Sequence, residues 1–237
     1  MKNELFLRKS YWLKYLGINN NRVPGCFILY GSWFFDKAIN YLEEIIDEQI
    51  KTSLPNLFLG KIKGRKIMYG AAYGSTMAGE MVHIAGSIGI KKIIFIGSYI
   101  SLEKNKNSIT IPDIIINYDN VLSWYKKNNK FKNDNIKLKE YFKKNKINYN
   151  TGKIATISFM LMENKKILKN YKNKKISGLD LELATVYGIS KFFKSNCFPI
   201  LIKSETYTGG KIIYTKKSDS RVVKKTLLKH LPKIVEL

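Results

Sequence analysis

The chain has 237 residues, which suits one medium domain or two small ones, and its 45% hydrophobic content is enough to build a core. Its net charge of +24 invites a nucleic-acid-binding interpretation, yet only four of its 42 basic residues are arginine: Arg8, Arg22, Arg65 and Arg221. Because the planar guanidinium is the group that usually reads nucleic acid, we expect most lysines to form a solvated surface and rank nucleic-acid binding last.

No apolar run reaches the roughly 18 residues that suggest a membrane span, so we expect no membrane partner. The two cysteines, Cys26 and Cys197, form no motif, and a reducing cytoplasm is the expected compartment. Residues 1–24 lack a continuous apolar signal core and are expected to form a helical extension of one domain, 25–237.

Apolar runs bounded by turn residues predict strands, and apolar residues at helical spacing predict helices. In chain order the predicted elements are a strand (26–30), a helix (36–50), a hairpin (57–69), a small-residue loop (70–79), a helix (80–89), strands (92–97, 109–118 and 154–162), a helix (179–193), a strand (198–203) and a closing helix (222–235). Residues 124–150 are rich in Lys and Asn, which predicts a surface helix pair or a mobile, variable insertion. The alternation of strands and helices predicts an α/β fold with a largely parallel sheet.

The segment 178–188 places Asp180 and Glu182 inside an apolar stretch with helical spacing. A desolvated carboxylate needs hydrogen-bond donors, and the 2′,3′-diol of a ribose offers two. The alternative is that both are helix-start acids after Ser177-Gly178, where a carboxylate complements the helix dipole.

Three segments follow predicted strands, at the edge where α/β folds place ligands. Backbone N–H groups of the loop 70–79 could bind an anion, although tight packing explains such a loop equally well. Gly97-Ser98 forms the second segment, and Ser204-Glu205 forms the third. Glu205 could hold a proton for catalysis, or it could be a loop carboxylate paired with a lysine.

Together these segments resemble the nucleoside phosphorylase and nucleosidase superfamily, in the same order over roughly residues 25 to 235. The resemblance lies in four motifs: Asp180-Leu181-Glu182 with small and apolar residues after it, Tyr73-Gly74-Ser75, the strand ending in Gly97-Ser98, and Ser204-Glu205. It implies a single-domain, three-layer α/β/α fold with a central mixed, largely parallel sheet.

Within the superfamily, the short form of AMP nucleosidase is the most similar branch. The likeness rests on Phe95 before Gly97-Ser98, on Asn164-Lys165-Lys166-Ile167, and on Lys217-Ser218-Asp219. That branch implies hydrolysis of AMP to adenine and ribose 5-phosphate, and a role in purine salvage.

The resemblance implies roles for individual residues. Glu205 would protonate the leaving base, and Glu182 would hold the ribose hydroxyls. The implied substrate-binding residues are Ser204, Leu181 beneath the sugar, Asp180, Phe159 against the base, Gly74, Ser75, Gly97 and Ser98 around an anion or water, and Lys165 and Lys166 at a 5′-phosphate. It implies no cofactor and no metal, a purine nucleotide or nucleoside as the small-molecule partner, inorganic phosphate in the phosphorolytic alternative, and a homo-oligomer, either trimer or hexamer.

The sequence also departs from the superfamily pattern. Phe34, Phe35 and Phe95 stand where phosphorylases carry phosphate-binding arginines, and Glu205 replaces an aspartate. Lysines replace the arginine pair, which keeps the charge and loses the bidentate geometry. Three interpretations remain open: a hydrolase, a phosphorylase that holds phosphate by lysines and backbone N–H groups, and a degenerate member that binds without catalysis.

Overall fold

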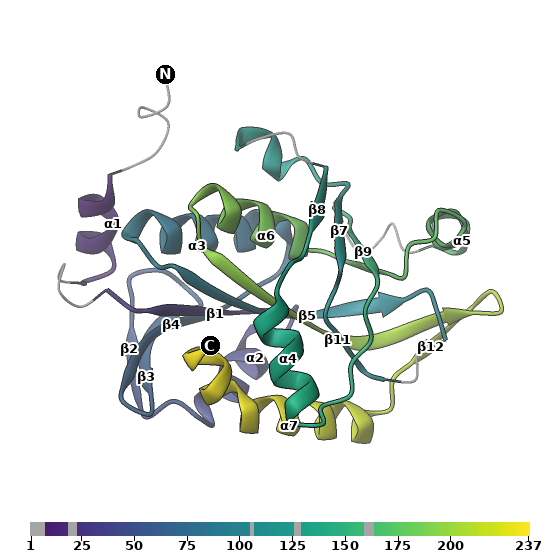
Figure 1. Ribbon diagram of the computed structural model, residues 1–237. Coiled ribbons are helices and arrows are strands. Elements are labelled where there is room, and N and C mark those ends of the chain that lie inside the picture. Colours follow the sequence, from purple (N-terminus) through teal and green to yellow (C-terminus); the bar gives the residue numbers. More distant parts are fainter. Residues whose placement is uncertain (1–7, 19–22, 105–106, 126–128, 159–163) are drawn as a thin grey trace.

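The computed structural model describes residues 8–18, 23–104, 107–125, 129–158 and 164–237. These residues form one mixed sheet with helices on both faces (Figure 1). The predicted three-layer α/β/α architecture is confirmed.

Parallel strands form the centre of the sheet. β1 (Cys26–Gly31) lies between β4 (Arg65–Ala72) and β5 (Lys92–Ser101), and β11 (Asn196–Thr208) lies along the other edge of β5. Their apolar runs are continuous because helices cover both faces at this point.

Shorter strands extend the sheet on both sides of this centre. They are β2 (Glu48–Lys51), β3 (Leu57–Ile62), β6 (Ile109–Thr110), β7 (Ile114–Asn117), β8 (Lys130–Lys132), β9 (Lys153–Thr156), β10 (Gly178–Asp180) and β12 (Lys211–Tyr214). β10 is parallel to β9 and antiparallel to β5.

Each face of the sheet has its own group of helices. On one face lie α1 (Lys9–Tyr15), α3 (Gly74–Ile88) and α6 (Leu183–Phe192), and on the other lie α2 (Phe35–Glu43), α4 (Ile136–Lys144) and α7 (Lys217–Glu236) (Figure 1). A short 3₁₀ helix, η2 (Val121–Trp124), adjoins α3 and α6, and α5 (Lys165–Asn173) packs on a third apolar cluster with β5, β10 and β11.

Several predicted elements were wrong in extent. The helix predicted over 36–50 ends at Glu43, and β2 follows it because pairing with β3 overrides local helical spacing. The loop predicted over 70–79 is the end of β4 and the start of α3, whose small residues serve close packing. The strand predicted over 109–118 divides into β6 and β7 around Pro112, which has no N–H to donate.

Other predicted boundaries also moved. β9 ends at Thr156, and residues 159–162 of that predicted strand lie outside the described residues. The closing helix begins at Lys217, five residues before the prediction. The Lys/Asn-rich segment provides a strand and one helix, with Leu138 and Phe142 in the core, in place of a surface helix pair. The proposed limits of the N-terminal extension and of the variable insertion stay predictions.

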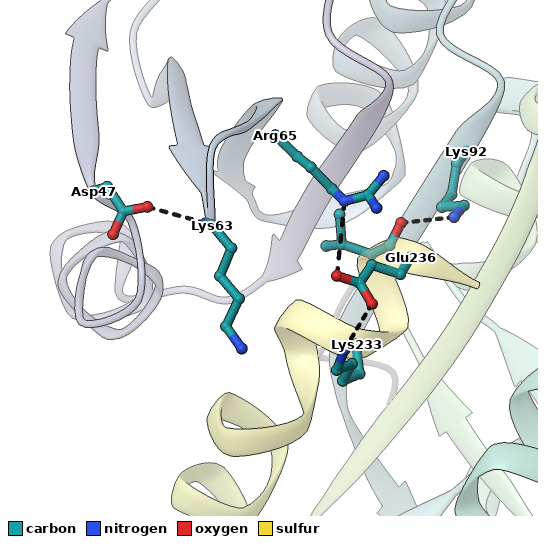
Figure 2. A network of polar contacts seen from close by, with 7 residues as sticks. Asp47, Lys63, Arg65, Lys92, Lys233 and Glu236 are labelled. Carbon is teal, nitrogen blue, oxygen red and sulfur yellow. Dashed lines mark hydrogen bonds and ion pairs between the residues drawn. The ribbon is translucent and has the colours of Figure 1, made fainter.

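Polar contacts hold the end of α7 against the N-terminal ends of the central strands (Figure 2). Lys92, at the start of β5, donates from Nζ to the Val235 carbonyl over 2.7 Å, and Glu236 contacts Lys233 at 3.0 Å and Arg65 at 3.7 Å. A cation at a helix C-terminus complements the carbonyl groups that lack helical partners. These contacts do not involve the opposite, C-terminal ends of the parallel strands.

Candidate functional site

A cavity of about 190 Å³ lies beyond the C-terminal ends of the central strands. On one edge of β5, β1 pairs with residues up to Ile96, whereas β10 pairs with Ile100 and Ser101, so a gap opens between them. The cavity is lined by Gly31, Ser32, Trp33, Phe34, Tyr73, Ser98, Tyr99, Ile100, Leu179, Asp180, Leu181, Glu182, Ser204 and Glu205. It therefore lies at a change in strand order, which is where open α/β sheets bind ligands.

Glu182 is the N-cap residue of α6, directly before Leu183, and its buried side chain lines this cavity. Its Oε1 accepts a hydrogen bond of 2.7 Å from the backbone N–H of Gly74, the first residue of α3. Gly74 has a φ of +77°, where a side chain would be strained. Burial raises the pKa of Glu182, the Asp180 carboxylate raises it further, and the Gly74 N–H opposes both.

Gly31 ends β1 beside this carboxylate. A Cβ atom at this position would lie only 3.1 Å from Glu182 Oε2 and 3.1 Å from the Phe95 ring. The glycine therefore gives the carboxylate the space it occupies.

Asp180 precedes the helix and was predicted to belong to it, but it lies on β10. Its Oδ1 accepts from the Thr156 hydroxyl over 2.6 Å, and its Oδ2 accepts from the N–H groups of Glu182 and Leu183. Burial raises the pKa of Asp180, and these three donors oppose the effect. Asp180 is thus a side-chain cap for the start of α6.

Glu205 comes from β11, which the prediction ended at residue 203 and which runs on to Thr208. The register against β5 shifts between Lys203 and Glu205, so a bulge lies at Ser204 and both Ser204 and Glu205 line the cavity. Thr215 holds the bulge by donating its N–H to the Ser204 carbonyl and its hydroxyl to the Lys203 carbonyl. Glu205 is half-buried, and this burial raises its pKa.

The structure brings six of the predicted site residues together on the cavity wall: Ser98, Asp180, Leu181, Glu182, Ser204 and Glu205. Gly74 and Ser75 lie behind it, where Gly74 binds Glu182 and the Ser75 hydroxyl donates to the Leu181 carbonyl. Gly97 packs against the Phe95 ring, which a Cβ would approach to 2.7 Å.

Two other predicted residues are not on the wall. Lys165 and Lys166 occupy the first turn of α5, where the Lys165 carbonyl accepts from the Tyr207 hydroxyl over 3.3 Å. Phe159 lies outside the described residues.

Sequence reasoning missed the aromatic side of the cavity. Trp33 and Phe34 are 59% and 60% exposed, and the Trp33 ring meets the Tyr73 ring edge-on with centroids 4.5 Å apart. The Ser32 hydroxyl accepts from the Phe34 N–H over 3.1 Å and fixes this turn. The available signal was three consecutive aromatic residues, Trp33 to Phe35, one residue after the glycine that ends a buried strand.

The charge of the cavity differs from that of the whole chain. Three carboxyl groups line it, from Asp180, Glu182 and Glu205, and none of the described lining residues is Lys, Arg or His. In a chain of net charge +24, this is an acidic and aromatic pocket. It suits a neutral ligand or one that develops positive charge during reaction.

Two further features of the described residues bear on the class of site. Within the described residues, no group of three or more His, Cys, Asp or Glu side chains is placed to hold a metal ion. Within the same residues, no helix is long and apolar enough to cross a membrane.

No protein-family sequence model and no curated protein sequence matches the chain. Solved structures do match. The 5′-methylthioadenosine/S-adenosyl homocysteine nucleosidase of Campylobacter jejuni aligns with a TM-score of 0.71 at 16% identity, over 89% of this chain and 99% of the other.

Two further structures align over a similar extent. A mutant futalosine hydrolase of Helicobacter pylori strain 26695 has a TM-score of 0.68 at 17% identity, over 90% of this chain and 99% of the other. The purine nucleoside phosphorylase of Toxoplasma gondii, in complex with immucillin-H, has a TM-score of 0.74 at 15% identity, over 92% of each chain. The chain therefore has the fold of the nucleosidases and nucleoside phosphorylases, as the sequence resemblance indicated.

The buried carboxyl of Glu182 makes a testable contribution to stability. Its pKa in the folded chain lies above the ordinary value of 4.5, so folding favours the protonated form. This stabilisation is complete below the pKa of the unfolded chain and is lost as the pH rises through the folded pKa. We expect the melting temperature of the wild type to fall over this range and that of Glu182→Gln to fall less, as measured by thermal unfolding from pH 4 to pH 9.

Burial also raises the pKa values of Asp180 and Glu205. The melting temperature of Glu182→Gln should therefore still fall with pH, but less steeply than that of the wild type. Parallel curves for the two proteins would contradict the burial of an ionisable Glu182.

Proposed function

We propose that the protein hydrolyses the N-glycosidic bond of a purine nucleoside or nucleotide. The observation that supports this most directly is that Glu182 and Glu205 line one cavity: Glu182 follows β10 on one edge of β5, and Glu205 lies on β11 along the other edge. Two acidic groups in one small cavity can act on the two ends of the bond that breaks.

The chemistry follows from the charges that develop. As the bond breaks, positive charge grows on the ribose and negative charge grows on the base. Glu182 accepts hydrogen bonds from the ribose hydroxyls and stabilises the cationic sugar. Glu205, whose pKa burial raises, donates a proton to the base nitrogen so that the leaving group departs neutral.

Water is the nucleophile that suits this cavity. Phosphate would have to enter beside three carboxyl groups, and the described lining offers no cation to bind it. Phe34 and Phe35 follow β1 where the resemblance leads one to expect an arginine, and Phe34 lines the cavity. Phosphorolysis is therefore the second candidate, and non-catalytic binding is the third.

Glu205 can be tested by changing its acidity without its shape. We expect Glu205→Gln to lower turnover by about 10²-fold or more, because the amide has no proton to give at neutral pH. The measurement is adenine release with and without inorganic phosphate. Glu205→Asp is the matched control and keeps the carboxyl group, so it should retain more activity than the Gln variant. Equal turnover in the wild type and the Gln variant would remove Glu205 from the mechanism.

AMP is the particular substrate that we propose from the sequence resemblance. The 5′-phosphate would need cations, and Lys165 and Lys166 are the candidates in the first turn of α5. Tyr207 connects that turn to β11, two residues beyond Glu205. An uncharged nucleoside such as adenosine is the alternative, which the acidic cavity favours.

Substrate preference separates these two candidates. If AMP is the substrate, we expect the double variant Lys165→Met/Lys166→Met to raise KM for AMP about tenfold or more and to leave adenosine unaffected, because only AMP carries the charge that the lysines would bind. Lys169→Met, an exposed lysine of the same helix, is the control for a general loss of charge. Faster release from adenosine than from AMP by the wild type, with no effect of the double variant, would reject AMP.

We also propose that the chain forms a homo-oligomer, a trimer or hexamer, and the cytoplasm stays its predicted compartment. A groove of about 630 Å³ between α1, α3 and η2 supports a contact surface on this face. Trp12, Leu54, Ile84 and Val121 line it, and Trp124 beside them is 74% exposed. Exposed apolar surface of this kind is typical of protein interfaces.

Sedimentation velocity tests the oligomer. We expect the wild type to sediment as a trimer or hexamer, and Trp124→Ser to shift it towards the monomer because an interface aromatic is lost. Tyr214→Ser is a matched control, since Tyr214 is 73% exposed on β12, far from this groove in the chain. A monomeric wild type would contradict the proposal.

A further inference from the structure

Asp180 uses both of its oxygens inside the protein. Thr156 donates to Oδ1 over 2.6 Å, and the N–H groups of Glu182 and Leu183 donate to Oδ2 over 3.0 and 2.5 Å. The Thr156 hydroxyl in turn accepts from the Ala184 N–H over 2.8 Å. Two side chains thus hold three consecutive N–H groups, and the residue fixed at the first of them is Glu182.

Asp180 has little exposed surface with which to contact a ligand. It is 2% exposed although it borders the cavity, and Thr156 is fully buried. A residue in this position can influence a ligand through its neighbour more readily than by direct contact.

The charge of Asp180 is placed to act on Glu182. The two carboxyl groups are two residues apart and both buried, and neither forms an ion pair within the described residues. The other titratable groups on the cavity wall are Tyr73 from the start of α3, Tyr99 from β5 and Glu205 from β11. The backbone N–H groups of Gly74 and Leu181 oppose the effect of the Asp180 charge on the Glu182 carboxyl.

We propose that Asp180 is a positioning residue: with Thr156 it fixes the backbone of Glu182, and its negative charge sets the pH at which Glu182 ionises. This role rests on the proposed function, in which Glu182 holds the ribose. The three donors keep Asp180 ionised, so Glu182 is the group that retains the proton longer. Burial and the Asp180 carboxylate both raise the pKa of Glu182, which agrees with this order.

Asp180→Asn tests the charge with little change of shape. An asparagine can accept from the two N–H groups through its oxygen and donate to Thr156 through its nitrogen. We expect the ionisation midpoint of Glu182 to fall by about one pH unit or more, because a repelling charge is removed. The midpoint is read from the ¹³C carboxyl signals of the free protein, with Glu182→Gln identifying the signal of Glu182.

Two further variants separate charge from position. Thr156→Val removes the hydroxyl, so it should weaken binding of adenosine at every pH, and Thr156→Ser should restore the affinity. Glu182→Gln should leave the midpoint of Asp180 in place, because Glu182 is still protonated while Asp180 loses its proton. This last measurement tests the proposal even if Asp180→Asn does not fold.

The outcomes are distinct. An unmoved Glu182 midpoint in Asp180→Asn, with affinity for adenosine lost equally at all pH values, would overturn the proposal in favour of direct contact. A fall of the Asp180 midpoint in Glu182→Gln would show the opposite order of ionisation and would also overturn it. A shifted midpoint in a protein that binds and cleaves no purine nucleoside would uphold the coupling and reject the proposed function instead.

Discussion

The hydrogen bond from the Gly74 N–H to the Glu182 carboxyl joins the first turns of α3 and α6, the two helices that cover the sheet beside the cavity. The neighbouring features depend on it. Gly31 must lack a side chain so that the carboxyl fits against β1, and Gly74 must adopt a positive φ so that its N–H points at the oxygen. Asp180 and Thr156 then fix the backbone from the other side. The group at the α3 N-terminus is therefore a carboxyl group of the protein itself.

The charged groups at the two ends of the parallel strands differ in sign. At their N-terminal ends, Lys92 and Arg65 neutralise the C-terminus of α7 (Figure 2). At their C-terminal ends, the cavity gathers three carboxyl groups without a described cation on its wall. The large positive charge of the chain thus does not reach the pocket lining, which supports the view that it belongs mostly to the solvated surface.

The sequence was sufficient for the centre of the fold, because β1, β5 and β11 are apolar runs that only a doubly covered sheet accommodates. It was insufficient at 178–182, where the helical spacing predicts a helix. In the structure Asp180 accepts a hydrogen bond from Thr156, which is 24 residues away, and β10 pairs with β9. The helix therefore begins only after this segment. The bulge at Ser204 could not be predicted either, because it is stabilised by a residue distant in the sequence. Thr215, directly after β12, donates its hydroxyl to the Lys203 carbonyl. The position of Trp33 on the cavity wall could not be predicted, because the neighbouring sequence does not indicate that an exposed aromatic side chain lines a cavity.

The cavity also constrains which departures from the superfamily pattern matter. Phe95 packs beneath Gly31 and Gly97, so an apolar ring there is part of the core and supports the space that Glu182 occupies. An arginine in its place would bury a positive charge beside the Glu182 carboxyl, whose pKa burial and Asp180 raise, and would favour the ionised form of that carboxyl. The apolar Phe95 ring and the two neighbouring acids, Asp180 and Glu182, are therefore physically compatible. This arrangement supports the proposed preference for a neutral nucleoside and a cationic transition state.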